Sequence, residues 1–149
     1  MLYVDAPVPD RIWPPERFAA VADFAIERLN AEVVAVAGSG GAGLAAMVRE
    51  VSRYPEQITV SSELTLPELA AVVASARLFV SNDTGPMHIG PAVGVLTLGL
   101  FSVGYPEHFR PMGAGDRYLR ENPIEKIQVG DVIATVSEMW AIAGRDPRR

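Results

Sequence analysis

The chain has 149 residues, a formal net charge of −5 at pH 7 and no cysteine. This length is typical of a single domain, which can bury about 68–70% of its unfolded surface without metals or disulfides. The lack of cysteine excludes disulfides, zinc–thiolate sites and a thiol nucleophile. The acidic balance, with Lys126 as the only lysine, argues against a nucleic-acid surface.

The first half of the chain alternates between short apolar runs and amphipathic stretches. Residues 16–29 carry apolar side chains at helical spacing, follow Pro15, which suits a first helical turn, and end at Asn30. The apolar runs are too short for helices and predict buried strands. In chain order we expect strands at residues 2–4, 32–37, 58–60 and 78–81, and helices at 16–29, 43–53 and 66–75.

The second half is less regular. A short helix is expected to begin near Asp83 or Thr84, and the Gly- and Pro-rich residues 102–115 predict a long irregular loop. Strands are expected at 96–101, 118–120 and 127–129, followed by a helix at 132–143 with Asp131 as its N-cap. Alternating strands and helices predict the α/β class with a doubly wound parallel sheet. Residues 1–144 would form this domain, and 145–149 a frayed tail.

Nothing in the sequence predicts a membrane segment. The N-terminus has no basic region followed by a long apolar one, and the longest apolar stretch, residues 93–101, is far too short to span a bilayer. We therefore expect a soluble cytoplasmic protein. No metal site is expected either, because the two histidines lie 20 residues apart without clustered carboxylates. We expect no cofactor.

The most informative segment is residues 81–90, Ser-Asn-Asp-Thr-Gly-Pro-Met-His-Ile-Gly. It follows a predicted strand and precedes a predicted short helix, whose free amides and positive dipole end favour phosphate. His88 lies one turn after Thr84 and can donate to the same anion. Taken singly, Asp83 could be only an N-cap and His88 only a core histidine. The combination at the end of a parallel strand favours a ligand site.

A glycine-rich string competes with this interpretation. Residues 38–43, Gly-Ser-Gly-Gly-Ala-Gly, match the dinucleotide pattern G-x-G-x-x-G between a strand and a helix. That pattern needs an acidic residue about 20 positions later to hold a ribose, and Glu56 and Glu63 are poorly placed for it. The string also follows the second predicted strand rather than the first. It could be a structural turn, a donor-facing loop or a dinucleotide site.

Three blocks together resemble glycosyltransferase family 9, the heptosyltransferase-like family of lipopolysaccharide and related surface-glycan assembly. They are residues 11–19 (Arg-Ile-Trp-Pro-Pro-Glu-Arg-Phe-Ala), residues 66–76 and the string Ser-Asn-Asp-Thr-Gly-Pro-Met-His at 81–88. The resemblance implies the GT-B architecture, two Rossmann-like domains facing each other across a cleft. All three blocks belong to the C-terminal, donor-binding domain. The N-terminal domain, which holds the acceptor and supplies the catalytic base, is expected to be missing here.

The resemblance also implies a reaction and its residues. A sugar would pass from a nucleoside diphosphate such as ADP-heptose to a glycan acceptor. Arg11, His88 and the amides of Thr84 and Gly85 would stabilise the departing diphosphate, with no residue assigned as a certain catalyst. The donor-binding residues would be Arg11, Leu64, Thr65, Asp83, Thr84, Gly85, Pro86, Met87 and His88, with Gly38, Gly40, Gly41, Glu107 and His108 as further candidates.

Two departures from the family pattern matter. The family's glycine loop often carries an acidic residue for a ribose hydroxyl, but this chain has none between Glu32 and Glu50. Because the acceptor domain is missing, we also expect the chain alone to be inactive. The alternatives are an isolated nucleotide-binding module without turnover and an NAD-linked Rossmann domain.

Overall fold

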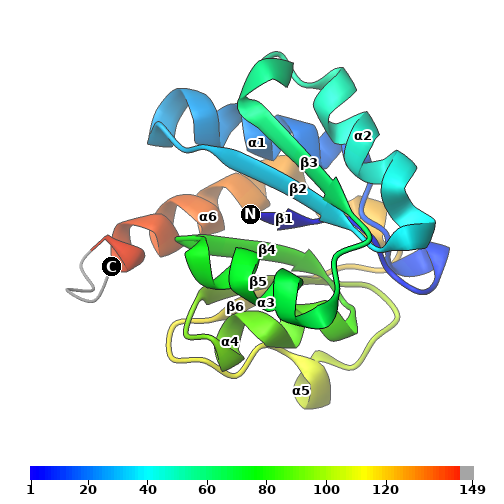
Figure 1. Cartoon of the computed structure of the whole chain (residues 1–149). Helices are drawn as coiled ribbons and strands as arrows, with labels where there is room; N and C mark the ends of the chain where they lie inside the picture. The colour runs from blue at the N-terminus through cyan, green and yellow to red at the C-terminus, as the bar shows by residue number, and fades with distance from the viewer. Residues whose placement is uncertain (145–149) are drawn as a thin grey trace.

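The computed structural model describes residues 1–144, so the predicted tail at 145–149 lies outside the described residues. Six strands form one sheet in the order β3-β2-β1-β4-β5-β6 (Figure 1). Every neighbouring pair is parallel, so all strands end at the same edge of the sheet. The strands are β1 (Leu2–Tyr3), β2 (Val33–Ala37), β3 (Ile58–Ser62), β4 (Leu78–Asn82), β5 (Leu96–Phe101) and β6 (Arg117–Arg120).

Helices cover both faces of the sheet (Figure 1). One face carries α1 (Pro15–Leu29), α2 (Ala42–Val51) and α6 (Val129–Ala143), and the other carries α3 (Leu66–Ser75) and α4 (Ile89–Ala92). The short α5 (Pro106–Phe109) lies in the loop after β5. Successive strand residues alternate between the two cores, as Val80 and Phe79 of β4 do. The predicted α/β fold, a Rossmann-like sheet of the GT-B type, is confirmed.

Local sequence signals explain where two of these helices begin and end. Thr65 and Glu68 form a capping box at the start of α3, in which each side chain bonds the other residue's backbone amide. Asn30 ends α1 in a left-handed conformation, with φ of 49°. No helix among residues 1–144 has the length and apolar character to cross a bilayer.

Three sequence-based expectations in the second half are wrong in detail. Residues 127–129 are not a strand: side-chain donors from Trp13 (3.2 Å) and Arg17 (2.7 Å) satisfy the Ile127 carbonyl instead. Helix α6 begins at Val129, so Asp131 is not its N-cap but lies in the first turn, where its charge still favours the dipole. The predicted irregular loop at 102–115 contains α5.

Candidate functional site

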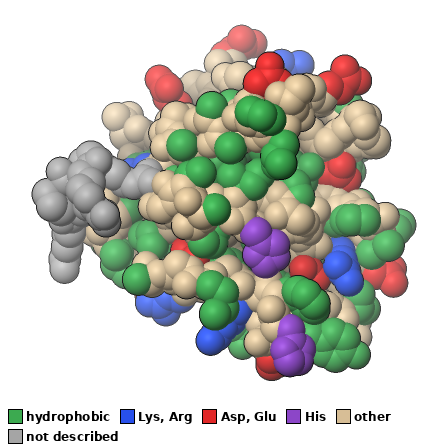
Figure 2. Space-filling model, turned by 60° about the horizontal axis from the view of Figure 1, so that its bottom comes forward, with side chains coloured by type: hydrophobic (Ala, Val, Ile, Leu, Met, Phe, Trp, Pro, Cys, Tyr) green, Lys and Arg blue, Asp and Glu red, His purple; other side chains and the backbone are tan. Residues whose placement is uncertain are grey.

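Loops from the ends of β1, β4 and β5 meet in one pocket at the carboxyl edge of the sheet. Its volume is about 250 Å³. Small-molecule pockets usually measure about 300–1,000 Å³, so this one has room for only part of a nucleotide. The histidine side chains lie on the face in Figure 2, among hydrophobic side chains and with acidic and basic ones nearby. The pocket is lined by Pro7, Arg11, Asp83, Thr84, Gly85, His88, Gly104, Tyr105 and Phe109.

The segment after β4 has a different local shape from the expected one. Thr84 is extended, with φ of −153° and ψ of 161°, and a 3-10 turn at Gly85–His88 comes before α4. Because α4 has only four residues, its dipole is small. The amides of Thr84 and Gly85 have no hydrogen-bond partner within residues 1–144. These two unpaired amides, rather than a helix dipole, are what the backbone of this segment could offer an anion.

Arg11 reaches the pocket from a loop far away in the sequence. Its guanidinium lies 3.3 Å from the Asp83 carboxylate. Trp13, two residues later, is fully buried and holds this loop in place. Its amide donates to the Asn82 side-chain oxygen at 3.2 Å, and its ring packs edge-on against Phe18 at 5.0 Å. Trp13 therefore packs in the core, two residues from Arg11, and anchors the loop that carries Arg11.

Of the two residues near which the sequence placed the start of this turn, Thr84 is the N-cap, and its side chain makes no capping hydrogen bond. The carboxylate of Asp83 pairs with Arg11, a contact that the local sequence could not show. Burial raises the pKa of Asp83 above its ordinary value, and the positive charges of Arg11 and His88 partly oppose this. Gly104 lies so close that a Cβ atom there would overlap the carboxylate. Asp83 is thus enclosed between two loops.

The loop after β5 contributes different residues from those expected. Glu107 pairs with Arg120 at 3.6 Å, and His108 stacks edge-on against Phe109 at 6.3 Å. Neither Glu107 nor His108 lines the pocket, whereas the exposed rings of Tyr105 and Phe109 do. Sequence reasoning missed these two aromatic residues, as well as Pro7 and Gly104. The sequence signal that could have found Tyr105 and Phe109 was the presence of aromatic residues in a Gly- and Pro-rich loop.

The remaining candidates lie outside this pocket. Met87 is fully buried beneath it, and Pro86 does not line it. The others follow β2 and β3, which lie beyond β1 along the same edge of the sheet. After β3, Leu64 packs against the core beneath α3 and Thr65 caps α3. After β2, Gly38, Gly40 and Gly41 form the turn before α2. A nucleotide that starts in the pocket would have to extend along the edge to reach them.

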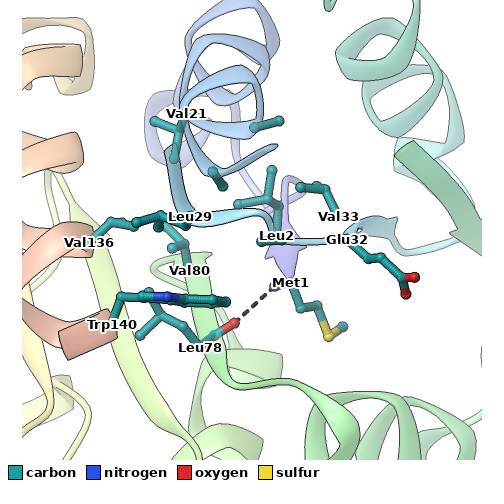
Figure 3. Close-up of a pocket in the computed structure, with 13 residues that line it drawn as sticks. Met1, Leu2, Val21, Leu29, Glu32, Val33, Leu78, Val80, Val136 and Trp140 are labelled. Carbon is teal, nitrogen blue, oxygen red and sulfur yellow. Dashed lines mark hydrogen bonds between the residues drawn. The ribbon is translucent and has the colours of Figure 1, made fainter. Parts of the chain in front are cut away.

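A second cavity lies at the opposite, amino-terminal edge of the sheet, between α1 and α6 (Figure 3). Its volume is only about 40 Å³. The lining is almost entirely apolar and includes Leu2, Leu29, Val80 and Trp140 (Figure 3). Apolar walls do not suit a charged diphosphate. This apolar cavity is therefore not a candidate for a diphosphate site.

The candidate site has the chemistry of an anion receptor. Arg11 offers a forked, permanently charged donor, His88 a ring donor, and Thr84 and Gly85 two backbone amides. No three His, Asp or Glu side chains within residues 1–144 come together as possible metal ligands.

Comparison with known proteins identifies the family of the chain. A family model described as glycosyltransferase family 9 (heptosyltransferase) matches residues 3–131. The chain belongs to this family. Membership agrees with the resemblance seen in the three sequence blocks.

Individual relatives cover nearly the whole chain. Lipopolysaccharide heptosyltransferase 3 from Escherichia coli is 29% identical, over 87% of this chain and 43% of its own length. A solved family 9 structure from Veillonella parvula DSM 2008 is 25% identical with a TM-score of 0.86, over 95% and 45%. The E. coli heptosyltransferase WaaC, solved with ADP, is 18% identical with a TM-score of 0.82, over 93% and 43%. The chain thus spans less than half of each relative.

Proposed function

We propose that this domain binds the diphosphate of a nucleoside-diphosphate sugar in the candidate site, as the donor half of a glycosyltransferase. The observation that carries the proposal is the convergence of Arg11, His88 and two amides on one pocket at the carboxyl edge of the sheet. Ligands of parallel α/β sheets bind at this edge. Four donors directed at one small pocket suit a compact polyanion better than a neutral ligand.

The proposed mechanism is stabilisation of the leaving group. When the bond between sugar and phosphate breaks, negative charge develops on the departing diphosphate. Arg11, His88 and the amides of Thr84 and Gly85 are donors fixed in advance where that charge forms, which lowers the barrier. Asp83 would keep the Arg11 guanidinium at the pocket until the ligand arrives, through the 3.3 Å ion pair.

The relatives suggest which donor and acceptor to test. WaaC was solved with ADP, and the curated E. coli relative is named for lipopolysaccharide. We therefore propose an ADP-linked sugar such as ADP-heptose as donor, and lipopolysaccharide or another surface glycan as acceptor. A cytoplasmic location stays a prediction of the sequence.

We further propose that these 149 residues do not turn over on their own. The pocket offers no evident base for an acceptor hydroxyl, since its carboxylate, Asp83, is paired with Arg11. Holding two reactants in attack geometry is worth about 7–11 kcal/mol in well-oriented systems. That contribution needs a second binding surface. Mixing the purified chain with ADP-heptose and truncated lipopolysaccharide should give no glycosylated product above background.

Calorimetric titration with ADP tests the binding step. Arg11→Gln and His88→Ala should each weaken ADP binding about tenfold or more, since a hydrogen bond to a charged group contributes roughly 1.5–3 kcal/mol. Arg49→Gln is the matched control, because Arg49 is an exposed arginine on α2 away from the pocket.

Three outcomes separate the candidate functions. Equal ADP affinity in all four proteins would exclude the pocket as the diphosphate site. NAD binding much tighter than ADP binding would favour the oxidoreductase alternative. A binding module would be favoured by a third outcome. In that outcome ADP binding depends on Arg11 and His88, and a larger protein that carries this domain with a second one also fails to transfer sugar.

A further inference from the structure

Asp5 follows β1 and lies against the glycine turn after β2. An ideal Cβ atom on Gly41 would lie 2.5 Å from Asp5 Oδ2 and 2.8 Å from Asp5 Cβ, and one on Gly38 would lie 3.1 Å from Oδ2. Real Cβ atoms essentially never come closer than 3.0 Å to another atom, so Gly41 tolerates no side chain while Asp5 is in place. The glycine turn therefore encloses a carboxylate.

Backbone conformation does not explain these two glycines. Gly38 has φ of −71° and Gly41 has φ of −106°, values that any residue adopts. Space for Asp5 is the requirement that the structure shows. Gly41, which occupies a variable position of the G-x-G-x-x-G string, is thus required by a side chain that lies more than thirty residues earlier in the sequence, and Gly38 gives the same side chain room.

One carboxylate oxygen of Asp5 has no partner among the described residues. Oδ1 accepts the Ala6 amide at 2.8 Å, whereas Oδ2 has no hydrogen-bond or ion-pair partner within residues 1–144. Asp5 is partly exposed. Its negative charge also contributes, after burial, to the raised pKa of the neighbouring Tyr3. A fixed, charged and partly free acceptor is what a pair of hydroxyl donors needs.

The position of Asp5 matches the next part of a nucleotide after the diphosphate. The sheet order places β1 between β4, which leads to the anion site, and β2, which leads to the glycine turn (Figure 1). Neighbouring strands are about 4.8 Å apart. Pro7, two residues after Asp5, already lines the pocket. Because the pocket of about 250 Å³ holds little more than a diphosphate, the nucleoside must continue along the edge.

We propose that Asp5 accepts hydrogen bonds from the 2′- and 3′-hydroxyls of the nucleotide ribose. This inference rests on the proposed function, since it requires a diphosphate in the pocket. A carboxylate on a neighbouring strand end is a common partner for a ribose diol in α/β nucleotide sites. Here β1 supplies it, and the loop after β2, which has no acidic residue between Glu32 and Glu50, supplies the space.

The test compares ADP with 2′,3′-dideoxy-ADP by calorimetry. The wild-type chain should bind ADP about ten to a hundred times more tightly than the dideoxy analogue. Asp5→Asn should lose most of that preference by weakening ADP binding, with dideoxy-ADP binding unchanged or slightly tighter. Asparagine keeps an oxygen for the Ala6 amide, so the fold should be preserved, which a melting curve checks.

Two further variants sharpen the comparison. Asp10→Asn removes a negative charge from an exposed position on the same loop, and should change binding of the two nucleotides slightly and equally. Gly41→Ala should reduce the preference for ADP while leaving Asp5 in the sequence, because the added methyl group displaces its carboxylate.

The possible failures are distinct. If the wild-type chain binds ADP and its dideoxy analogue equally, or if Asp5→Asn weakens both by the same factor, Asp5 only holds the turn and the inference is overturned. If the wild-type chain binds neither nucleotide, the proposed function and this inference fail together.

Discussion

Replacing Gly104 by alanine would disturb the enclosure of Asp83. A Cβ atom at residue 104 would overlap Asp83 Oδ2, and would lie 3.1 Å from Asp83 Cγ and 3.3 Å from Phe101 Cδ1. Ordinary contacts begin at 3.4 Å. Phe101 is fully buried and cannot yield easily. Either Asp83 rotates away from Arg11, or the loop after β5 moves outward.

The size of the effect follows from this geometry. Inserting a methyl group into a filled space costs about 1–3 kcal/mol. For a domain of this length, each kcal/mol lowers Tm by roughly 2–4 °C. We therefore expect Gly104→Ala to lower Tm by about 2–12 °C.

Differential scanning calorimetry with a double-mutant cycle tests the reasoning. Gly130→Ala is the control: nothing lies within 4 Å of its ideal Cβ, and it occupies a helix, so Tm should stay or rise. If the overlap with the carboxylate is the cause, Asp83→Ala should restore most of the Tm lost in Gly104→Ala. Strictly additive effects of the two substitutions, or a Gly104→Ala protein as stable as wild type, would refute it.

Two further predictions concern stability. Gly90→Ala would place a Cβ atom 3.2 Å from Thr97 Cβ and in overlap with the Thr97 hydroxyl oxygen. The free energy of unfolding should therefore fall by about 1–3 kcal/mol. An unchanged midpoint of urea unfolding would contradict this prediction. The Thr65 hydroxyl and amide lower the pKa of Glu68 below 4.5, so its contribution to stability is full above that pH and is lost as the pH falls through the folded-state value. Acidification from about pH 5 to about pH 3 should thus lower Tm less in Glu68→Gln than in wild type, and equal losses would count against the capping box.

Much of the sheet could be predicted because its signals are local. Buried parallel strands appear as short apolar runs, and the start of α3 carries a recognisable Thr-x-x-Glu pattern. The strand predicted at residues 127–129 was wrong because this segment carries no such local signal. The three residues Ile-Gln-Val are too few to establish a strand period, and the partners of the Ile127 carbonyl, Trp13 and Arg17, lie more than a hundred residues earlier.

The candidate site shows the same division. The grouping of Asp83, Thr84, Gly85 and His88 at one pocket could be predicted from the order of residue types in this segment. The pairing of Asp83 with Arg11, the enclosure by Gly104 and the approach of Asp5 to Gly41 could not, because each joins loops that only the strand order brings together. Sequence separation hides such contacts even when each residue looks notable alone.

The buried side chains next to the site have a consequence for mutational mapping. Met87 is fully buried directly before His88, and Trp13 is fully buried two residues after Arg11. A scan that replaced each residue of these segments in turn would record lost binding at Met87 and Trp13 as strongly as at their neighbours. Read as a footprint, that scan would count two fully buried side chains as part of the ligand's contact surface. Only a comparison of affinity with folding stability, variant by variant, would separate the residues that touch the ligand from those that aim them.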